Sequence, residues 1–161
     1  MTGLVLALCL WAAPAGVLRL GPPPPGPVER VVTLAPSLTE TVLELGAGKA
    51  LVGVSRFDEH PAVAALPRVG GFIDPSVETV VSLKPQLVIA QMAPGNRAAV
   101  EKMAELGLSV IALPLTTTAD VLTAITEVGR ALGAAEKAAV LVADIVQTRE
   151  KVRADAKERN T

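Results

Sequence analysis

Short aliphatic runs alternate with helical patterns along most of the chain. The runs are rich in Val, Ile and Leu, which is typical of strands with both faces buried. Four of them follow in order, at residues 31–34, 51–54, 87–90 and 110–113. Between consecutive runs, apolar residues recur every three or four positions, as on one side of a helix. This order predicts an α/β fold with a short, mainly parallel sheet, right-handed crossovers and helices on both faces.

Polar residues with capping chemistry precede the helical patterns. Ser37, followed by Glu40 three residues later, has the spacing of a capping box, and Gly46 is placed to end that helix. Ser76 and Asn96 stand at the start of the next two helical patterns. The sequence therefore predicts a helix after each of the first three aliphatic runs.

The pattern changes after the last aliphatic run. Thr118 is the expected cap of a helix that Gly133 ends, and residues 135–159 then carry apolar side chains at spacings of three, four and seven. A single helix over 135–159 would be ~37 Å long, which is longer than the preceding small domain needs. The charged end, 149–161, has no partner in the predicted fold. We expect a helix pair over 118–161 whose long second helix reaches toward a neighbouring domain; a solvated helix end is the alternative.

The N-terminal segment, 1–15, has the pattern of a secretory signal peptide. Its apolar run, 4–12, is too short to cross ~30 Å of hydrocarbon, and a small-x-small pattern ends at Ala15. We therefore expect export, with cleavage after Ala15. A misassigned start or a short buried helix is the alternative. A lipoprotein anchor at Cys9 is weaker still, because Leu8 stands where lipoprotein signals have a small residue.

Residues 16–27 form a proline-rich linker in this interpretation. The stretch 21–27 contains five prolines, which fix φ and lack backbone donors, so we expect an extended spacer instead of packed structure. The folded α/β domain is expected to begin at Val28 and to span 28–117. A ligand for a proline-recognising domain is the alternative role of the stretch.

Composition excludes several classes of function. Half of the 161 residues are apolar, which is enough for a domain with a buried core. Lys and Arg total 15 against 16 Asp and Glu, and no segment combines basic residues with aromatic ones, so the chain lacks the positive surface that nucleic acid requires. One cysteine and one histidine exclude a disulfide framework and a zinc site built from several Cys or His ligands.

The candidate binding chemistry lies in the loops that follow the predicted strands, where open parallel sheets bind ligands. Beyond the predicted signal peptide the only aromatic residues are Phe57 and Phe72, the only histidine is His60, and all three fall in these loops. Flat rings beside an imidazole and carboxylates suit a large, partly planar, partly polar ligand. The alternative is that both rings plug the end of the sheet. The expected ligand-binding residues are Ser37, Arg56, Phe57, Asp58, His60, Phe72 and Gln91.

Catalytic and metal-binding interpretations are weaker. No glycine-rich loop of the phosphate-cradling type follows a predicted strand, since 46–49 closes a helix. An α/β hydrolase-like enzyme that uses Ser37 and His60 is the alternative from another class, but that pair still needs an orienting acid and an oxyanion hole. His60 beside Asp58 and Glu59 is more typical of a solvent-facing loop than of a metal site. We therefore expect no catalytic residue, no cofactor and no resident metal.

The order of several segments resembles a known family. The segments are RVVTLAPSLTE (30–40), LVGVS (51–55), LPRVGGF (66–72), PSVE (75–78) and SLKPQLVI (82–89). Together they are similar to the periplasmic binding proteins of cobalamin, haem and iron-siderophore ABC importers, and the resemblance extends over 30–159. It implies two α/β lobes joined by one long rigid helix, with the ligand held between the lobes. In this chain 135–159 would be that backbone helix, and the C-terminal lobe would be absent from the 161 residues.

The resemblance also implies a function and partners. The protein would carry a small metal chelate, cobalamin or a related corrinoid, to the transmembrane subunits of an ABC permease, as a periplasmic monomer that catalyses nothing. Haem or a ferric siderophore is the alternative ligand. Glu78 falls where the family has a surface glutamate that docks onto permease arginines. His60 stands where tyrosine is frequent and would ligate iron if the ligand were haem, whereas 70–72 is nearer to corrinoid binders. A tethered scaffold that pairs through the long helix is a further alternative, but the apolar spacing breaks at Thr148 and Arg149.

Overall fold

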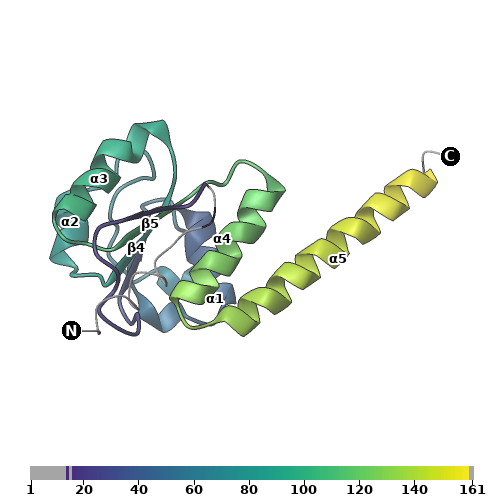
Figure 1. Cartoon of the computed structure of the whole chain (residues 1–161), viewed down its shortest axis with the longest axis horizontal. Helices are drawn as coiled ribbons and strands as arrows, with labels where there is room; N and C mark the ends of the chain where they lie inside the picture. Colours follow the sequence, from purple (N-terminus) through teal and green to yellow (C-terminus); the bar gives the residue numbers. More distant parts are fainter. Residues whose placement is uncertain (1–13, 15, 160–161) are drawn as a thin grey trace, which may run out of the picture.

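The computed structural model describes residue 14 and residues 16–159, which form the predicted α/β fold (Figure 1). The predicted signal peptide apart from Pro14 lies outside the described residues, and so does Cys9. The described sheet has five strands in the order β1-β5-β4-β2-β3. β1 runs antiparallel to β5, and all other pairs are parallel. The strands are β1 Leu18–Leu20, β2 Val31–Thr33, β3 Leu51–Gly53, β4 Leu87–Gln91 and β5 Val110–Leu113.

Helices follow β2, β3, β4 and β5, as the alternating pattern predicts. The α-helices are α1 Pro36–Glu44, α2 Val77–Ser82, α3 Arg97–Glu105, α4 Thr118–Ala131 and α5 Ala135–Arg159. Short 3₁₀ turns in the connections are η2 Gly48–Ala50, η3 Pro61–Val63 and η4 Pro94–Asn96. The strand-helix order confirms the fold class expected from the sequence.

Both faces of the sheet are buried, and the strands supply alternate residues to two hydrophobic cores. Val31 and Ile89 belong to the core that α1, α4 and the start of α5 cover. Val32 and Val88 belong to the core that α2 and α3 cover. Successive side chains of a strand point to opposite faces, so a strand buried on both sides admits a polar side chain only where that side chain finds a partner. Thr33 in β2 is fully buried, and its Oγ1 lies 2.6 Å from Thr39 Oγ1. This requirement explains why the runs are almost entirely aliphatic.

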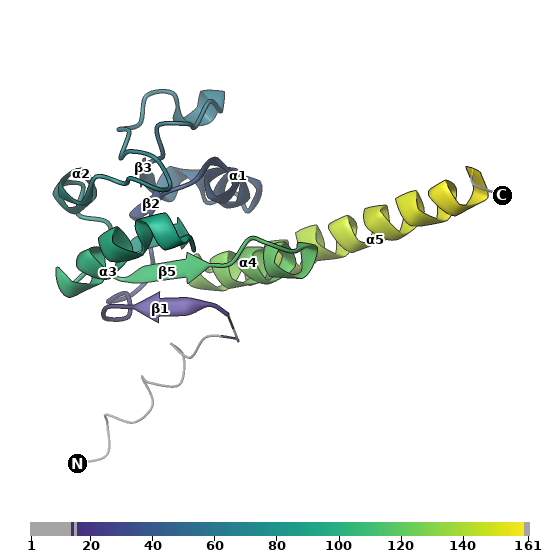
Figure 2. The same ribbon diagram turned by 90° about the horizontal axis from the view of Figure 1, so that it is seen from above.

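The predicted proline-rich linker, 16–27, contains one strand of the described sheet, β1, just before the stretch 21–27 that we expected to be an extended spacer. Leu18–Leu20 pairs with β5 in antiparallel register, and Val17 before it is buried. Figure 2 shows β1 lying beside β5 at the edge of the sheet. Farther along, the Ser109 hydroxyl donates a hydrogen bond to the Pro22 carbonyl at 2.6 Å. The packed fold therefore begins before Val28, because the apolar residues ahead of the prolines outweigh the tendency of the prolines to extend the chain.

A buried ion pair fastens β1 to α4. The guanidinium of Arg19 bonds to Glu127, and only 6% of the Arg19 side chain and 1% of the Glu127 side chain are exposed. The other carboxylate oxygen of Glu127 accepts a hydrogen bond from Arg130 at 2.7 Å. A buried carboxylate is costly without such partners, so Arg19 makes the burial of Glu127 possible.

The helix caps differ in part from the predicted ones. The prediction that Ser37 caps α1 is wrong: Ala35 occupies the cap position, with no side-chain cap bond, and the helix begins at Pro36. Proline fits the first position of a helix because it has no N–H to satisfy. Ser76 does cap α2, since its hydroxyl accepts a hydrogen bond from the Thr79 N–H at 3.2 Å.

The cap of α4 lies one residue before the predicted one. Thr117, instead of Thr118, accepts a hydrogen bond from the Asp120 N–H at 3.1 Å, and Asp120 accepts one from the Thr117 N–H at 2.8 Å. These reciprocal bonds form a capping box. The hydrogen bond from the Thr117 backbone is the main reason that the pKa of Asp120 lies below its ordinary value.

The long helix α5 has the predicted bounds and leaves the body of the domain after its first turns (Figures 1 and 2). Its buried residue, Ala138, packs against Gly129 of α4. The contact is so close that a Cβ at Gly129 would overlap the Cβ of Ala138. Within the described part of the chain, no helix is long and apolar enough to cross a membrane.

We predict that Arg19→Met lowers the free energy of unfolding by about 3 kcal/mol, because it leaves the Glu127 carboxylate buried without its main partner. Arg130→Met is the matched control, since Arg130 bonds to the same carboxylate but its side chain is 55% exposed; we expect it to cost at most about 1 kcal/mol. Urea denaturation followed by circular dichroism measures both. Equal effects of the two substitutions would show that Arg19 of β1 is not the main partner of the buried Glu127 carboxylate.

Candidate ligand-binding site

The carboxyl ends of β2 and β4 meet where the order of the strands reverses. α1 continues from β2 toward one core and α3 follows β4 toward the other, and open α/β sheets bind ligands at such switch points. Two expected site residues, Ser37 and Gln91, line a cavity of about 260 Å³ there. Its other lining residues are Leu38, Thr41, Leu115, Val121 and Ala124.

Two loops at the same edge, 55–61 and 70–75, are joined through Arg56. The backbone N–H of Arg56 donates to the Gly70 carbonyl at 2.8 Å. Its side-chain Nη2 lies 2.9 and 2.8 Å from the two carboxylate oxygens of Asp74. The guanidinium carbon also lies 5.0 Å from the centre of the Phe57 ring, which is within the range of a cation–π contact. We name these two loops the rim.

Gly71 lets the parts of the rim approach one another. A Cβ at this position would lie 2.5 Å from Asp74 Oδ1, 2.9 Å from the Phe57 ring and 3.2 Å from Arg56 Nη2. No real Cβ tolerates the first two contacts, so a larger residue would push the ring and the ion pair apart. The Gly70-Gly71 pair in the sequence thus has a steric reason.

The two aromatic side chains play different parts. The Phe57 side chain stands on the surface at 55% exposed, with Ile73 at 54% and Met92 at 37% on neighbouring loops. Exposed apolar side chains on adjoining loops are typical of a surface that binds a ligand or a partner. Phe72 is half-buried and packs against the core beneath α1 and α4. Phe72 therefore serves in part as the plug that the alternative interpretation described, whereas Phe57 does not.

Asn96, which the sequence suggested only as a helix cap, holds the rim to β4. It makes no side-chain cap bond. Instead, its Nδ2 donates to the carbonyls of Phe72 at 2.7 Å and Gln91 at 2.8 Å, and its Oδ1 accepts from the Ala93 N–H at 3.3 Å. The residue is 2% exposed. Its buried amide satisfies backbone groups from two loops that are distant in sequence, and helix patterns cannot signal such a contact.

Asp58 and His60 lie in the rim but differ in exposure. Asp58 is 4% exposed, and its Oδ2 has no hydrogen-bond partner in the described part of the chain. His60 is exposed, and its Nδ1 accepts a hydrogen bond from the Ala62 N–H at 3.1 Å, which caps η3. An imidazole that accepts at Nδ1 carries its proton on Nε2. Binding a metal through Nε2 would therefore cost this cap.

The described residues contain no group of three or more His, Cys, Asp or Glu side chains that would hold a metal ion. Nor do Ser37 and His60 share a hydrogen bond in the described structure, since His60 is engaged by Ala62 while Ser37 lines the switch-point cavity. The geometry therefore gives the hydrolase alternative no nucleophile-base pair.

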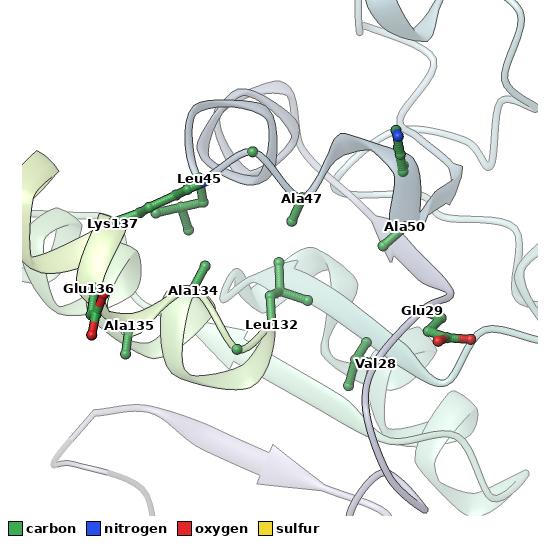
Figure 3. Close-up of a pocket in the computed structure, with 13 residues that line it drawn as sticks. Val28, Glu29, Leu45, Ala47, Ala50, Leu132, Ala134, Ala135, Glu136 and Lys137 are labelled. Carbon is green, nitrogen blue, oxygen red and sulfur yellow. The ribbon is translucent and has the colours of Figure 1, made fainter.

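A larger cavity, of about 740 Å³, lies at the other end of the strands, where β2 and β3 begin (Figure 3). It is bounded by Val28 before β2, by the turn 46–50 before β3 and by the connection 132–137 between α4 and α5. In Figure 3, Lys137 extends from α5 toward Leu45 at the end of α1. None of the expected ligand-binding residues lines this cavity.

Comparison with known proteins decides the family. The sequence pattern of the family described as periplasmic binding protein matches residues 31–161, which is most of the chain. The chain belongs to the periplasmic binding protein family. This confirms the resemblance seen in the sequence.

Three similar proteins illustrate the range of relatives. The chain is 34% identical over 85 residues to the vitamin B12-binding protein of Vibrio vulnificus, covering 52% of this chain and 31% of that protein. It is 31% identical over 137 residues to the uncharacterized ABC transporter substrate-binding lipoprotein YvrC of Bacillus subtilis, covering 81% of this chain and 44% of that one. The crystal structure of the periplasmic heme binding protein HutB of Vibrio cholerae is similar with a TM-score of 0.69 at 26% identity, covering 78% and 49% of the two chains.

The chain spans about half the length of these proteins or less. The matched part fits the N-terminal lobe of two-lobe binding proteins, as the sequence led us to expect. These relatives are named for binding and transport, which gives no support to the hydrolase alternative. Their names divide between vitamin B12 and haem, so family membership alone does not fix the ligand of this chain.

We predict that Asn96→Asp lowers the free energy of unfolding by about 2 to 3 kcal/mol, because a carboxylate replaces the donor that faces two buried carbonyls. It should also accelerate amide hydrogen exchange in 70–75. Asn96→Asp keeps the shape of the side chain, so a variant as stable as the unchanged protein would show that these hydrogen bonds do not hold the rim. Urea denaturation and hydrogen exchange followed by mass spectrometry measure the two effects.

Proposed function

We propose that this chain is the N-terminal ligand-binding lobe of an extracytoplasmic substrate-binding protein, which carries cobalamin or a related corrinoid to an ABC permease. The observation that supports this most directly is the exposed Phe57 ring, which the Arg56 guanidinium contacts in a loop at the same edge of the sheet as the switch-point cavity. A flat apolar face next to polar groups suits a large macrocycle with a polar periphery. The similarity to vitamin B12-binding proteins supports the same ligand class.

In this proposal five of the expected site residues have distinct parts. Phe57 packs against one face of the ligand, and Phe72 supports the rim while offering its exposed portion. Ser37 and Gln91 bind peripheral polar groups from the switch-point cavity. Asp58 is buried, so in this proposal it influences the ligand from below the surface of the loop and not as an exposed contact.

Haem is the second candidate, because His60 is an exposed imidazole on the rim and the fold resembles a heme binding protein. The hydrogen bond from the Ala62 N–H to His60 Nδ1 weighs against it. Iron ligation at Nε2 needs the proton to move to Nδ1, which would break a bond of about 1 kcal/mol. A corrinoid makes no such demand.

Glu78 is the proposed docking residue for the permease. It lies exposed in the first turn of α2, where negative charge is favoured by the helix dipole. An exposed carboxylate on a rigid helix is suited to charge-assisted hydrogen bonds with arginines of a partner. This proposal leaves the ligand site and the docking surface on separate elements.

We predict that Phe57→Ala weakens binding of cyanocobalamin by about 1 to 3 kcal/mol, the contribution of one stacked face. Leu106→Ala is the control, because Leu106 is 52% exposed but lies at the far end of α3; it should have no effect. NMR titration of the 161-residue chain measures the weak binding expected of a single lobe. Binding in the nanomolar range would contradict the two-lobe proposal, and unchanged affinity in Phe57→Ala would remove Phe57 from the site.

A parallel titration with haemin, followed by its absorption spectrum, tests the second candidate. A shift of the Soret band that His60→Ala abolishes would assign haem as the ligand and overturn the corrinoid proposal. The corrinoid proposal predicts NMR shifts in 55–75 on adding cyanocobalamin and no His60-dependent change in the spectrum of haemin.

We also predict that Glu78→Ala weakens docking onto the permease by at least threefold while leaving ligand affinity unchanged, because the lost carboxylate is a partner for arginine only. Glu44→Ala removes an exposed carboxylate from α1, on the opposite side of the sheet, and should change neither. Surface plasmon resonance against the permease in nanodiscs measures docking. Equal losses of docking and of ligand affinity would indicate a structural role for Glu78.

A further inference from the structure

The loops at the binding edge carry an unequal set of charges. The loops 35–37, 55–61, 70–75, 91–96 and 114–117 contain one cation, Arg56, and three carboxylates, Asp58, Glu59 and Asp74. Arg56 is already bonded to both oxygens of Asp74. After this pairing, two acidic side chains are left in these loops, the exposed Glu59 and the buried Asp58. Among the residues of these loops, carboxyl groups therefore outnumber cations, and the one cation already has a carboxylate partner.

We propose that the Arg56–Asp74 pair is a charge filter, which makes the rim select macrocycles with uncharged peripheral groups and disfavour those with peripheral carboxylates. This inference rests on the proposed function and specifies the chemical class of its ligand. The preferred ligand is a metal chelate rimmed by neutral amides. A chelate rimmed by carboxylates is the disfavoured class.

The filter follows from what a ligand carboxylate would have to do. A ligand carboxylate that displaces Asp74 from Nη2 gains nothing, because the guanidinium satisfies one carboxylate before the exchange and one after it. A ligand carboxylate that instead bonds with Nε and Nη1 places a second carboxylate on the same guanidinium and is repelled by Asp74. The pair is exposed, with side chains 49% and 59% exposed, so this repulsion is modest. The carboxylates of Asp58 and Glu59, in the same loop as Arg56, add to it.

A neutral amide meets no such competition. Both hydrogen bonds of the Arg56 side chain are made by Nη2, so Nε and Nη1 have no partner in the described structure. Arginine has five N–H donors in a fixed plane, and those left over donate to an amide carbonyl without disturbing Asp74. The plane of donors lies beside the Phe57 ring, 5.0 Å from its centre. In this proposal the Phe57 ring contacts the face of the macrocycle, and the remaining Arg56 donors bond with amides at its edge.

The test compares cyanocobalamin with its monocarboxylic acids, in which one peripheral propionamide has been hydrolysed to a carboxylate. NMR titrations use the full 161-residue chain at low salt. We expect the unchanged protein to bind the acids about threefold to tenfold more weakly than cyanocobalamin. Asp74→Asn frees the guanidinium and should abolish or reverse this discrimination. Asp144→Asn, which removes an exposed carboxylate from α5, should leave it unchanged.

The outcomes separate this inference from the proposed function. If neither cyanocobalamin nor its acids bind the unchanged protein, the corrinoid proposal fails and the filter fails with it. If cyanocobalamin binds and the acids bind equally well, the proposed function stands and the filter is overturned. Discrimination that persists in Asp74→Asn also overturns the filter. Discrimination that weakens as salt rises supports it, because exposed charges are screened.

Discussion

Burial of both faces of the parallel sheet is the constraint on which the rest of this structure depends. The strands give alternate side chains to two cores, one beneath α1 and α4 and the other beneath α2 and α3. With both faces covered, the chain can meet a large ligand only at the ends of the strands. The switch between β2 and β4 leaves a cavity at the carboxyl ends of these strands, and the loop after β3 supplies the exposed ring.

The loops of the candidate binding edge are joined to one another and to β4 mostly by hydrogen bonds of the backbone. Arg56 is held to Gly70 through its N–H, and Asn96 holds the carbonyl of Phe72. A Cβ at Gly70 or at Gly71 would push parts of these loops apart. The exposed Phe57 ring therefore stands on loops that hydrogen bonds within the protein already hold together. A preorganised surface of this kind loses less conformational entropy on binding.

The sequence predicted those features that repeat along the chain. The strands from β2 onward and α5 follow from the periods of their apolar residues, and their bounds are close to the expected ones. β1 was missed because Leu18–Leu20 is short and precedes a run of prolines. Ser37 was taken for a cap because capping boxes are defined by spacing alone, and spacing does not reveal that Pro36 already begins the helix.

The candidate site was predictable as a set of residues and not as an arrangement. The scarcity of aromatic residues singled out Phe57 and Phe72, but nothing in their spacing distinguished the exposed ring from the half-buried one. The pairing of Arg56 with Asp74 joins residues 18 positions apart. The hydrogen bond from Asn96 to the Phe72 carbonyl joins residues 24 positions apart. Such contacts depend on how loops converge in space, and no local pattern records them.

Because Gly129 and Ala138 are in close contact near one end of α5, a small change of angle at this contact causes a large displacement at the other end of the helix. Ala138 is buried near one end of the 25 residues of α5, and the far end is exposed. A tilt of about 5° at this pivot would move the tip of a ~37 Å rod by about 3 Å. Gly129, which has no side chain, and Ala138, which has only a methyl group, thus bring the two helices into close contact. A methyl group added at Gly129 would overlap Ala138 and change the direction in which the exposed part of α5 leaves the domain.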